Sequence, residues 1–281
     1  MSYPGGKNGS GVYQRIISQM PPHEVYIEPF LGAGAIMRLK RPAKLNIGID
    51  LDSRALKIAR AGITRATDNG RRPTAKSTIG PGRDPHGKDA DTDLHGRNTD
   101  SAGGIGAPAD VRSFFFKRDG IEFLSTYKFS GKELVYCDPP YVMETRTREL
   151  YRFELSDRDH RQLLRCCRSL PCMVMISGYW AELYDSLLKD WRTISFPAMT
   201  RGGTFRTEFL WMNFPEPVQL HDYRYLGENF RERDNIKRKK LRWTSRLRRM
   251  PTLERMALLS ALQDVTIGGD AESRESAAKT D

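Results

Sequence analysis

Four consecutive residues, Asp138, Pro139, Pro140 and Tyr141, follow an apolar segment at 133–137 and place hydrogen-bond acceptors beside an aromatic ring. Neither proline has a backbone N–H group, so each adds a carbonyl acceptor and no donor. A residue that precedes a proline is also restricted to extended geometry, which makes the turn stiff. A stiff group of acceptors next to a flat ring suits a ligand that donates hydrogen bonds and has a π-face.

The exocyclic amine of a nucleobase is a ligand of this kind. It is a poor nucleophile, because its lone pair is delocalised into the ring. The Asp138 carboxylate and the Pro139 carbonyl can each accept one of its hydrogens, which favours a pyramidal nitrogen, and Tyr141 can stack on a base that has left the helix. Such a nitrogen can attack a sulfonium methyl group in line, helped by positioning and electrostatics. The motif at 138–141 is therefore predicted to be catalytic.

A second group of residues has the spacing of a nucleoside-binding loop. Glu28 and Phe30 lead into two glycines, Gly32 and Gly34, where a predicted strand meets a predicted helix. In open α/β sheets, ligands bind at the carboxyl ends of the strands, and glycines there let a ligand approach the backbone closely. Asp50 ends the next predicted strand, and an acid at this position suits the hydroxyl groups of a ribose. We therefore expect these five residues to contact a nucleoside cofactor.

The elements that position these residues alternate between strand and helix. Strands are predicted at 25–28, 45–50, 133–137, 172–177, 191–196 and 207–214, and helices after the glycine loop and at 53–61, 119–127, 156–169 and 181–189. Alternation of this kind predicts an α/β fold with a doubly wound, Rossmann-like sheet. The last strand follows a Gly-Gly turn instead of a helix, so we expect it to pair antiparallel and make the sheet mixed.

Residues 64–109 interrupt the pattern. They include no aromatic residue and few large aliphatic ones, and they are rich in Gly, Pro, Asp, Arg and Thr. Such a segment buries too little apolar surface to offset its ordering entropy, so it is predicted to be a disordered surface insertion. Residues 1–63 and 110–215 are then expected to form one catalytic domain.

The chain after residue 215 has a different composition. Between residues 221 and 250 there are eleven lysines and arginines and four acidic residues, an excess of seven positive charges. This excess fits either a solvated helical face or a helix that binds polyphosphate, and the interleaved Tyr223, Tyr225 and Trp243 favour the second interpretation. We predict a basic helical tail at 216–265 and a disordered C-terminus at 266–281. The candidate DNA-binding residues are Arg201 in the Gly-Gly turn and Lys237, Arg238, Lys239 and Lys240 in the tail.

Composition excludes several classes of protein. The net charge of +11 and the isoelectric point near 9.6 favour a polyanionic partner. No run approaches 18 apolar residues, so no membrane span is expected, and the N-terminus lacks the apolar core of a signal peptide, which favours the cytoplasm. The four cysteines form no Cys-x-x-Cys pair and no histidine stands at ligand spacing, so no metal site is expected.

Together, the motifs resemble those of the Dam-type DNA adenine-specific methyltransferases, over residues 1–63 and about 110–215. The matching motifs, in chain order, are Tyr3-Pro-Gly-Gly-Lys7, Glu28-Pro-Phe-Leu-Gly-Ala-Gly34, Asp50 and Asp138-Pro-Pro-Tyr141. The resemblance implies a methyltransferase fold that uses S-adenosylmethionine, with Tyr3, Lys7, Asp50 and Asp138 in contact with that cofactor. The family usually has tryptophan where this chain has Tyr3. Ser177-Gly-Tyr179 lies where the family closes its base pocket.

The chain departs from the family between the second strand and the catalytic strand. The family has a folded target-recognition region there, whereas this chain has the insertion at 64–109. Base edges are read by side chains on ordered elements, so recognition here is expected to be short, weak or moved, with Arg201 and the basic tail as candidates. The expected function is site-specific methylation of the adenine amine in double-stranded DNA, in a restriction-modification or phage setting. Methylation of the cytosine amine or of RNA, and a DNA-binding protein with a silent catalytic centre, are the alternatives.

Overall fold

The computed structural model describes residues 7–9, 11–68, 111–145, 151–199 and 203–277, without the side chains of 64–68 and 266–277. The chain divides into two compact units, Met1–Leu226 and Gly227–Asp281. Each unit is described by itself below. The predicted site residues Tyr3 and Arg201 lie outside the described residues.

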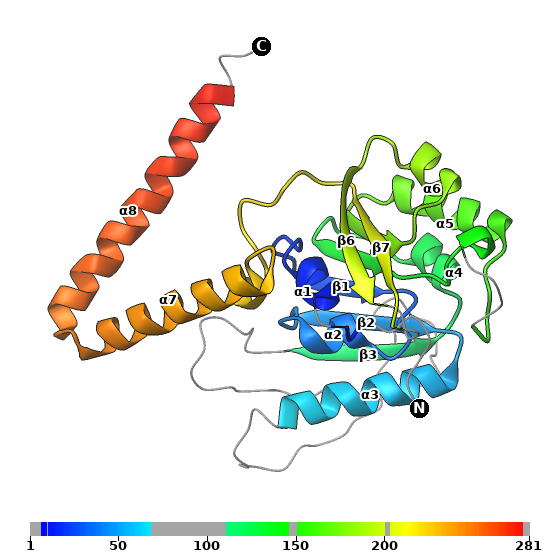
Figure 1. The fold of residues 1–281 in the computed structure, drawn as a ribbon, viewed down its shortest axis with the longest axis horizontal. Helices are drawn as coiled ribbons and strands as arrows, with labels where there is room; N and C mark the ends of the chain where they lie inside the picture. The colour runs from blue at the N-terminus through cyan, green and yellow to red at the C-terminus, as the bar shows by residue number, and fades with distance from the viewer. Residues whose placement is uncertain (1–6, 10, 69–110, 146–150, 200–202, 278–281) are drawn as a thin grey trace. The chain divides into compact units, whose positions relative to one another are not determined.

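Seven strands form one sheet in the order β3-β2-β1-β4-β5-β7-β6 (Figure 1). Their bounds are Val25–Glu28 for β1, Leu45–Asp50 for β2, Arg112–Lys117 for β3, Glu133–Cys137 for β4, Met173–Gly178 for β5, Arg192–Met199 for β6 and Phe205–Met212 for β7. Neighbouring strands are parallel from β3 to β5, whereas β7 runs antiparallel to both β5 and β6. This is the strand order of the Rossmann-like S-adenosylmethionine-dependent methyltransferase fold. The predicted fold class is confirmed, including the antiparallel final strand.

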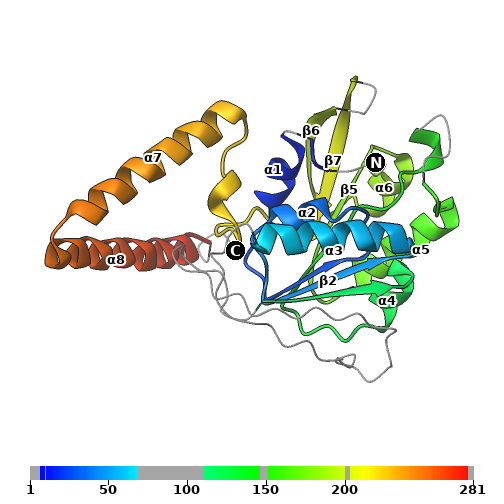
Figure 2. The same cartoon turned by 90° about the horizontal axis from the view of Figure 1, so that it is seen from below.

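Helices cover both faces of the sheet (Figures 1 and 2). They are α1 (Val12–Ile17), α2 (Ala35–Leu39), α3 (Ser53–Asp68), α4 (Gly120–Thr126), α5 (Asp157–Ser169) and α6 (Glu182–Leu187), with short 3-10 turns at Met143–Thr145 and Tyr223–Tyr225. Successive residues of β4 enter different cores. Leu134 and Tyr136 pack with α1, α2 and α3, whereas Val135 and Cys137 pack with α4, α5 and α6. A strand covered on both faces reads as a continuous apolar run, which is why β4 was predictable.

The other predicted strands are present, with ends shifted by up to three residues. The start of α5 follows from a capping box: Ser156 Oγ accepts from Asp159 N at 3.3 Å, and Asp159 Oδ2 accepts from Ser156 N at 2.9 Å. Strand β3 is an element that the sequence pattern does not predict. Its three consecutive phenylalanines at 114–116 show no alternation, because this edge strand is half-buried along both faces.

Helix α3 ends later than the sequence predicts. It was expected to stop at residue 61, but its backbone stays helical to Asp68. Residues 64–68, assigned to the disordered insertion, are therefore helical. The rest of the predicted insertion, residues 69–109, lies outside the described residues.

Residues 216–226 were assigned to the tail, but they pack on the first unit. Asp222 Oδ2 accepts from the backbone N of Arg41 at 2.8 Å, and the Tyr225 hydroxyl donates to the backbone carbonyl of Leu39 at 3.1 Å. The ring of His221 stacks on that of buried His23, with 3.8 Å between ring centroids. The first unit therefore extends to Leu226, because these side chains find partners on α1, α2 and the loops beside them.

The second unit is formed by helices α7 (Phe230–Arg249) and α8 (Thr252–Ala277). Asn229 caps α7 by accepting from Glu232 N, and the helix ends at Met250 because a residue that precedes a proline avoids the helical conformation. The disordered C-terminus predicted from residue 266 is corrected as far as Ala277, since α8 continues through residues such as Ala and Glu that favour a helix. In the part of the chain that the structure describes, no helix is long and apolar enough to cross a membrane.

Candidate active site

The carboxyl ends of the parallel strands meet at one edge of the sheet. Asp50 ends β2, Asp138 follows β4 directly, and Ser177 lies near the end of β5. β1 pairs with both β2 and β4, so the loop that follows Glu28 lies between Asp50 and Asp138. The fold thus brings the predicted cofactor loop and the predicted catalytic motif to the same place, as expected for this class of sheet.

Asp138 is held through one of its two carboxylate oxygens. Its Oδ1 lies 2.9 Å from Lys7 Nζ and accepts from Ser177 Oγ at 3.0 Å, and Ser177 Oγ in turn accepts from the Tyr136 hydroxyl at 2.8 Å. Among the described residues, Oδ2 has no hydrogen-bond partner, and the side chain is 18% exposed. Burial raises the pKa of Asp138 to about 6, although Lys7 favours its ionised form. The carboxylate is therefore oriented, with one oxygen available to a donor.

Lys7 is a buried cation between two carboxylates. Its Nζ lies 2.8 Å from Glu208 Oε1 on β7, and its side chain is only 5% exposed. Burial alone would lower the pKa of Lys7, but Asp138 and Glu208 together raise it well above its ordinary value, so the lysine stays charged. Lys7 also donates to the hydroxyl of Tyr141. The structure thus places Lys7 against the carboxylate of Asp138, a contact that the sequence did not predict.

Glu208 is the residue of this cluster that sequence reasoning missed. Its side chain is 2% exposed and accepts from the Tyr141 hydroxyl at 3.1 and 3.2 Å. Tyr141 is thereby held by its hydroxyl, while its ring lies 4.3 Å from that of Tyr179, at 46°. A glutamate inside the otherwise apolar stretch at 207–214 was the signal that could have identified it, since a buried carboxylate requires a partner.

The two prolines of the motif differ in exposure. Pro139 is buried, whereas Pro140 is half-buried and lines the cleft described below. The peptide bonds of both are trans, as are all those of the described residues. The motif thus continues from the buried end of β4 toward the cleft.

The glycine loop requires its glycines. Gly32 and Gly34 have φ angles of 50° and 63°, in the left-handed region that favours glycine. A Cβ atom on Gly34 would lie 2.9 Å from the Cβ atom of Ala59 on α3. Asp50 fixes the loop from the other side: its Oδ2 accepts from Gly32 N at 2.8 Å and its Oδ1 from Asp52 N at 2.7 Å. Each of these oxygens keeps a further lone pair for a ligand.

Glu28 supports the loop from inside. Its Oε2 accepts from the Tyr26 hydroxyl at 2.9 Å and from Met37 N at 3.2 Å, at the start of α2. Burial raises the pKa of Glu28 to about 8. These contacts are to the protein interior, so the prediction that Glu28 touches a cofactor stays a prediction.

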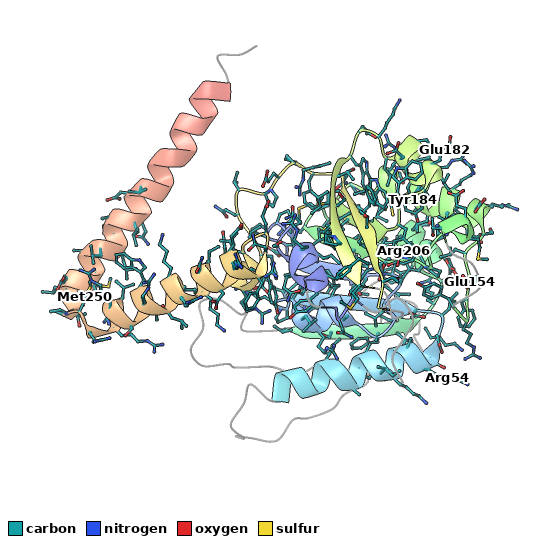
Figure 3. All side chains as sticks on the ribbon, viewed as in Figure 1. Arg54, Glu154, Glu182, Tyr184, Arg206 and Met250 are labelled. Atoms are coloured by element: carbon teal, nitrogen blue, oxygen red, sulfur yellow. The ribbon has the colours of Figure 1, made fainter. Side chains whose placement is uncertain are left out.

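A cleft of about 240 Å³ opens between the loop and the motif. Five of its lining residues were predicted to be functional: Phe30, Gly32, Asp50, Asp138 and Pro140. Residues that sequence reasoning did not single out form other parts of the wall, among them Tyr151, Phe153, Glu154 and Gln162. Figure 3 shows Glu154 among the side chains at this end of the first unit. The cleft combines polar groups with aromatic walls, as small-molecule sites do.

Four of the predicted DNA-binding residues belong to the second unit. Lys237, Arg238, Lys239 and Lys240 are exposed on α7, in the second unit. Arg238 forms an ion pair with Asp234 one turn earlier in the helix. In the described part of the chain, no group of histidine, cysteine, aspartate and glutamate side chains is placed to hold a metal ion.

No family model matches the chain, and no curated protein matches it in sequence. Several solved structures resemble its fold. An S-adenosylmethionine-dependent methyltransferase from Agrobacterium tumefaciens is 10% identical with a TM-score of 0.41, and the match covers 72% of this chain and 60% of that one. TrmK of M. capricolum, in complex with S-adenosyl-homocysteine, is 7% identical with a TM-score of 0.40, over 92% and 96%. Magnesium protoporphyrin IX methyltransferase from Synechocystis is 10% identical with a TM-score of 0.39, over 73% and 76%. These likenesses concern the fold alone.

Proposed function

We propose that this chain is an S-adenosylmethionine-dependent methyltransferase that modifies the exocyclic amine of adenine in DNA. The observation that carries the proposal is the position of Asp138. Its carboxylate lines the cleft, is oriented through Oδ1 by Lys7 and Ser177, and has Oδ2 available to a donor. An amine that donates to Oδ2 lies beside the glycine loop, where a nucleoside cofactor is expected.

The residues of the cleft fit S-adenosylmethionine. Gly32 has no side chain to obstruct a ligand, Asp50 can accept from the ribose hydroxyls, and Phe30 supplies an apolar surface for the adenine ring. The cofactor, when bound, supplies a methyl group activated by a sulfonium. The side chains and carbonyls of this chain would hold the amine, orient it and accept its proton.

The motif prepares the amine for attack. Asp138 Oδ2 and the Pro139 carbonyl each accept one amine hydrogen, which localises the nitrogen lone pair toward the methyl donor. Lys7 favours the ionised form of Asp138, and Ser177 fixes its orientation. The Tyr141 ring, held through its hydroxyl by Glu208 and buried beside Tyr179 in this structure, is the proposed surface on which the base stacks. The N–C bond would form as the S–C bond of the sulfonium breaks to leave a neutral thioether, and Asp138 can accept the proton that the nitrogen releases.

The choice of DNA rests on charge and on the sequence resemblance. The net charge of +11 and the exposed cations of α7 favour a polyanion, and the motif order resembles that of the DNA adenine methyltransferases. The cytosine amine carries the same two hydrogens, and RNA offers both bases. These alternatives are therefore separate outcomes of the test.

The test is to incubate the protein with labelled S-adenosylmethionine and mixed-sequence DNA, digest the product and identify the methylated nucleoside. Label in N6-methyladenine supports the proposal, and Asp138→Ala is the matched control that should yield none. Label in N4-methylcytosine would show that the substrate is cytosine in DNA. Label that appears only in a parallel digest of RNA would show that the substrate is RNA. No label with any nucleic acid would overturn the proposal.

A further inference from the structure

A second, open hollow lies beside the catalytic motif. It spans about 460 Å³, and its wall combines aromatic rings, an arginine, carboxylates and threonines, among them Glu144, Thr145, Tyr179, Trp180, Glu182 and Arg206. Tyr179 connects the hollow to the motif, because its ring lies 4.3 Å from that of Tyr141. A strand of nucleic acid with its target base at Tyr141 therefore has this hollow as a neighbouring site.

Trp180 gives the hollow an exposed ring. It comes two residues after the end of β5, and its side chain is 51% exposed. The other tryptophans of the first unit, Trp191 and Trp211, are buried. Every nucleobase has a π-face, so an exposed indole next to a base-binding corner is suited to stacking on a second base.

Arg206 holds the wall together. Its Nη1 donates to the backbone carbonyl of Thr145 at 2.6 Å, and its guanidinium lies 5.1 Å from the centre of the Tyr179 ring. Arg206 stands two residues before Glu208 on β7, so both side chains are on the same face of the strand. One strand thus contributes to the motif and to the hollow.

The charge of the hollow favours a base over a phosphate. Among the described residues of its wall, the exposed Glu144 and Glu182 bring two negative charges and Arg206 brings one positive charge, and Figure 3 labels Glu182 and Arg206. Carboxylates repel phosphate but accept hydrogen bonds from the amino groups of bases. Aromatic stacking with nearby carboxylate acceptors is therefore suited to a base that carries an exocyclic amine.

We propose that this hollow binds the nucleobase next to the target base and so determines the sequence that is methylated. The flanking base stacks on Trp180, and Glu144 or Glu182 accepts its amino hydrogens. Adenine, cytosine and guanine have such hydrogens, whereas thymine does not. The inference rests on the proposed function, and it assigns base reading to ordered residues of the first unit.

Two measurements test it. In the first, duplexes that differ only in the bases beside one adenine are methylated by the parent and by Trp180→Ala, Glu144→Gln and Glu182→Gln. We expect the parent to have a kcat/KM at least tenfold lower when the neighbouring base is thymine. At least one of the two glutamine variants should lose most of that preference. Trp180→Ala should raise KM at least fivefold while kcat stays within twofold of the parent. Trp243→Ala, on α7, is the matched control and should keep the preference. Unchanged preference and KM in all three hollow variants would overturn the inference.

The second measurement does not require methyl transfer. In a Trp243→Phe background, the exposed indole that remains is Trp180, so its fluorescence should be quenched by short single-stranded oligonucleotides, and the quenching should be lost in the Trp180→Phe variant. Quenching without methylation of any nucleic acid would reject the proposed function and keep the base site. Methylation of adenine without quenching would reject the base site and keep the proposed function.

Discussion

Lys7 connects three parts of the chain that are distant in sequence: its own N-terminal segment, the motif at 138–141 and strand β7. Its ammonium contacts Asp138 after β4, the hydroxyl of Tyr141 and Glu208 on β7. Desolvating a lysine is costly unless its charge is compensated, and here two carboxylates compensate it. The reactive carboxylate and the stacking ring are therefore positioned by the same cation.

Removal of the Asp138 carboxylate should abolish methyl transfer. Asp138→Ala deletes an amine acceptor, and Asp138→Asn replaces a charged acceptor with an amide that cannot take a proton. Both variants should lose at least a thousandfold in kcat, measured with labelled S-adenosylmethionine and DNA. Ser177→Ala, which removes one orienting hydrogen bond of 3.0 Å, should lose about tenfold. If Asp138→Ala transferred methyl groups at close to the parental rate, the site around Asp138 would not be the active site.

Activity should depend on a group that titrates near pH 6. Burial raises the pKa of Asp138 from 3.8 to about 6, and the carboxylate form is the acceptor, so kcat/KM should fall as pH drops below about 6. A raised folded-state pKa has the opposite effect on stability, because ionisation of Asp138 weakens the fold as pH rises from about 4 through 6. Loss of activity at pH 5 without a lower thermal unfolding midpoint would match this assignment, whereas a flat activity profile from pH 5 to 8 would contradict it.

Glu208 should act through its neighbours. In the Glu208→Gln variant, Lys7 and Tyr141 lose a charged partner, so kcat should fall about tenfold. Glu208 also raises the pKa of Asp138, so its neutralisation should move the acid limb of the pH profile to lower pH. A merely structural role would lower activity without moving that limb. Glu208→Ala leaves a buried lysine with fewer partners and should cost about 3 kcal/mol in the free energy of unfolding.

The predicted residues were those that lie in contiguous motifs. Asp138, Gly32 and Asp50 each follow a strand that its own composition reveals, and a parallel sheet brings such strand ends together. Glu208 was missed because its role depends on β7 being placed beside β5, a pairing between distant residues. Trp180 was missed because exposure of a ring after β5 cannot be read from a local pattern.

At the scale of elements, local chemistry predicted the starts of helices better than their ends. The Ser156–Asp159 capping box marks where α5 begins, whereas α3 was expected to end at residue 61 although the helix-stop signal Asn69-Gly70 follows its last residue, Asp68. Strand β3 was missed because an edge strand lacks the clean alternation of a sheet with one solvated face. The doubly wound α/β class of the sheet, in contrast, followed from the alternation of strand and helix.

The segment between α3 and β3 offers a test at this scale. Its composition predicts no packed core, so we expect replacement of residues 70–108 with a short Gly/Ser linker to preserve the fold and the methylated sequence. The entropy of loop closure changes by only about 0.6 kcal/mol per doubling of length, so the unfolding midpoint should be unchanged or slightly higher. Methylated sites are mapped in DNA treated with each protein. A relaxed or lost site in a shortened protein that still folds would show that this segment reads the sequence.

At the scale of the whole molecule, positive charge is concentrated in α7, whose 20 residues include ten lysines and arginines and two acidic residues. Neutralising Lys237, Arg238, Lys239 and Lys240 to glutamine should weaken DNA binding and reduce its salt dependence, because each phosphate contact contributes roughly 0.9 to the slope of log affinity against log salt. All four are exposed, so the fold of α7 should persist and S-adenosylmethionine affinity should stay the same. If the salt slope does not change, these residues form only a solvated surface.

The contact between Lys7 and Glu208 also determines when, during synthesis of the chain, the proposed active site can first be complete. The two residues are 201 positions apart, so a ribosome finishes one long before it makes the other. Until β7 has been synthesised and inserted between β5 and β6, Lys7 lacks one of its two carboxylates and the Tyr141 hydroxyl lacks its acceptor. Pairings between distant residues form late in folding. A nascent chain can therefore complete its glycine loop early, while the proposed methyl-transfer site waits for the last strand of the sheet.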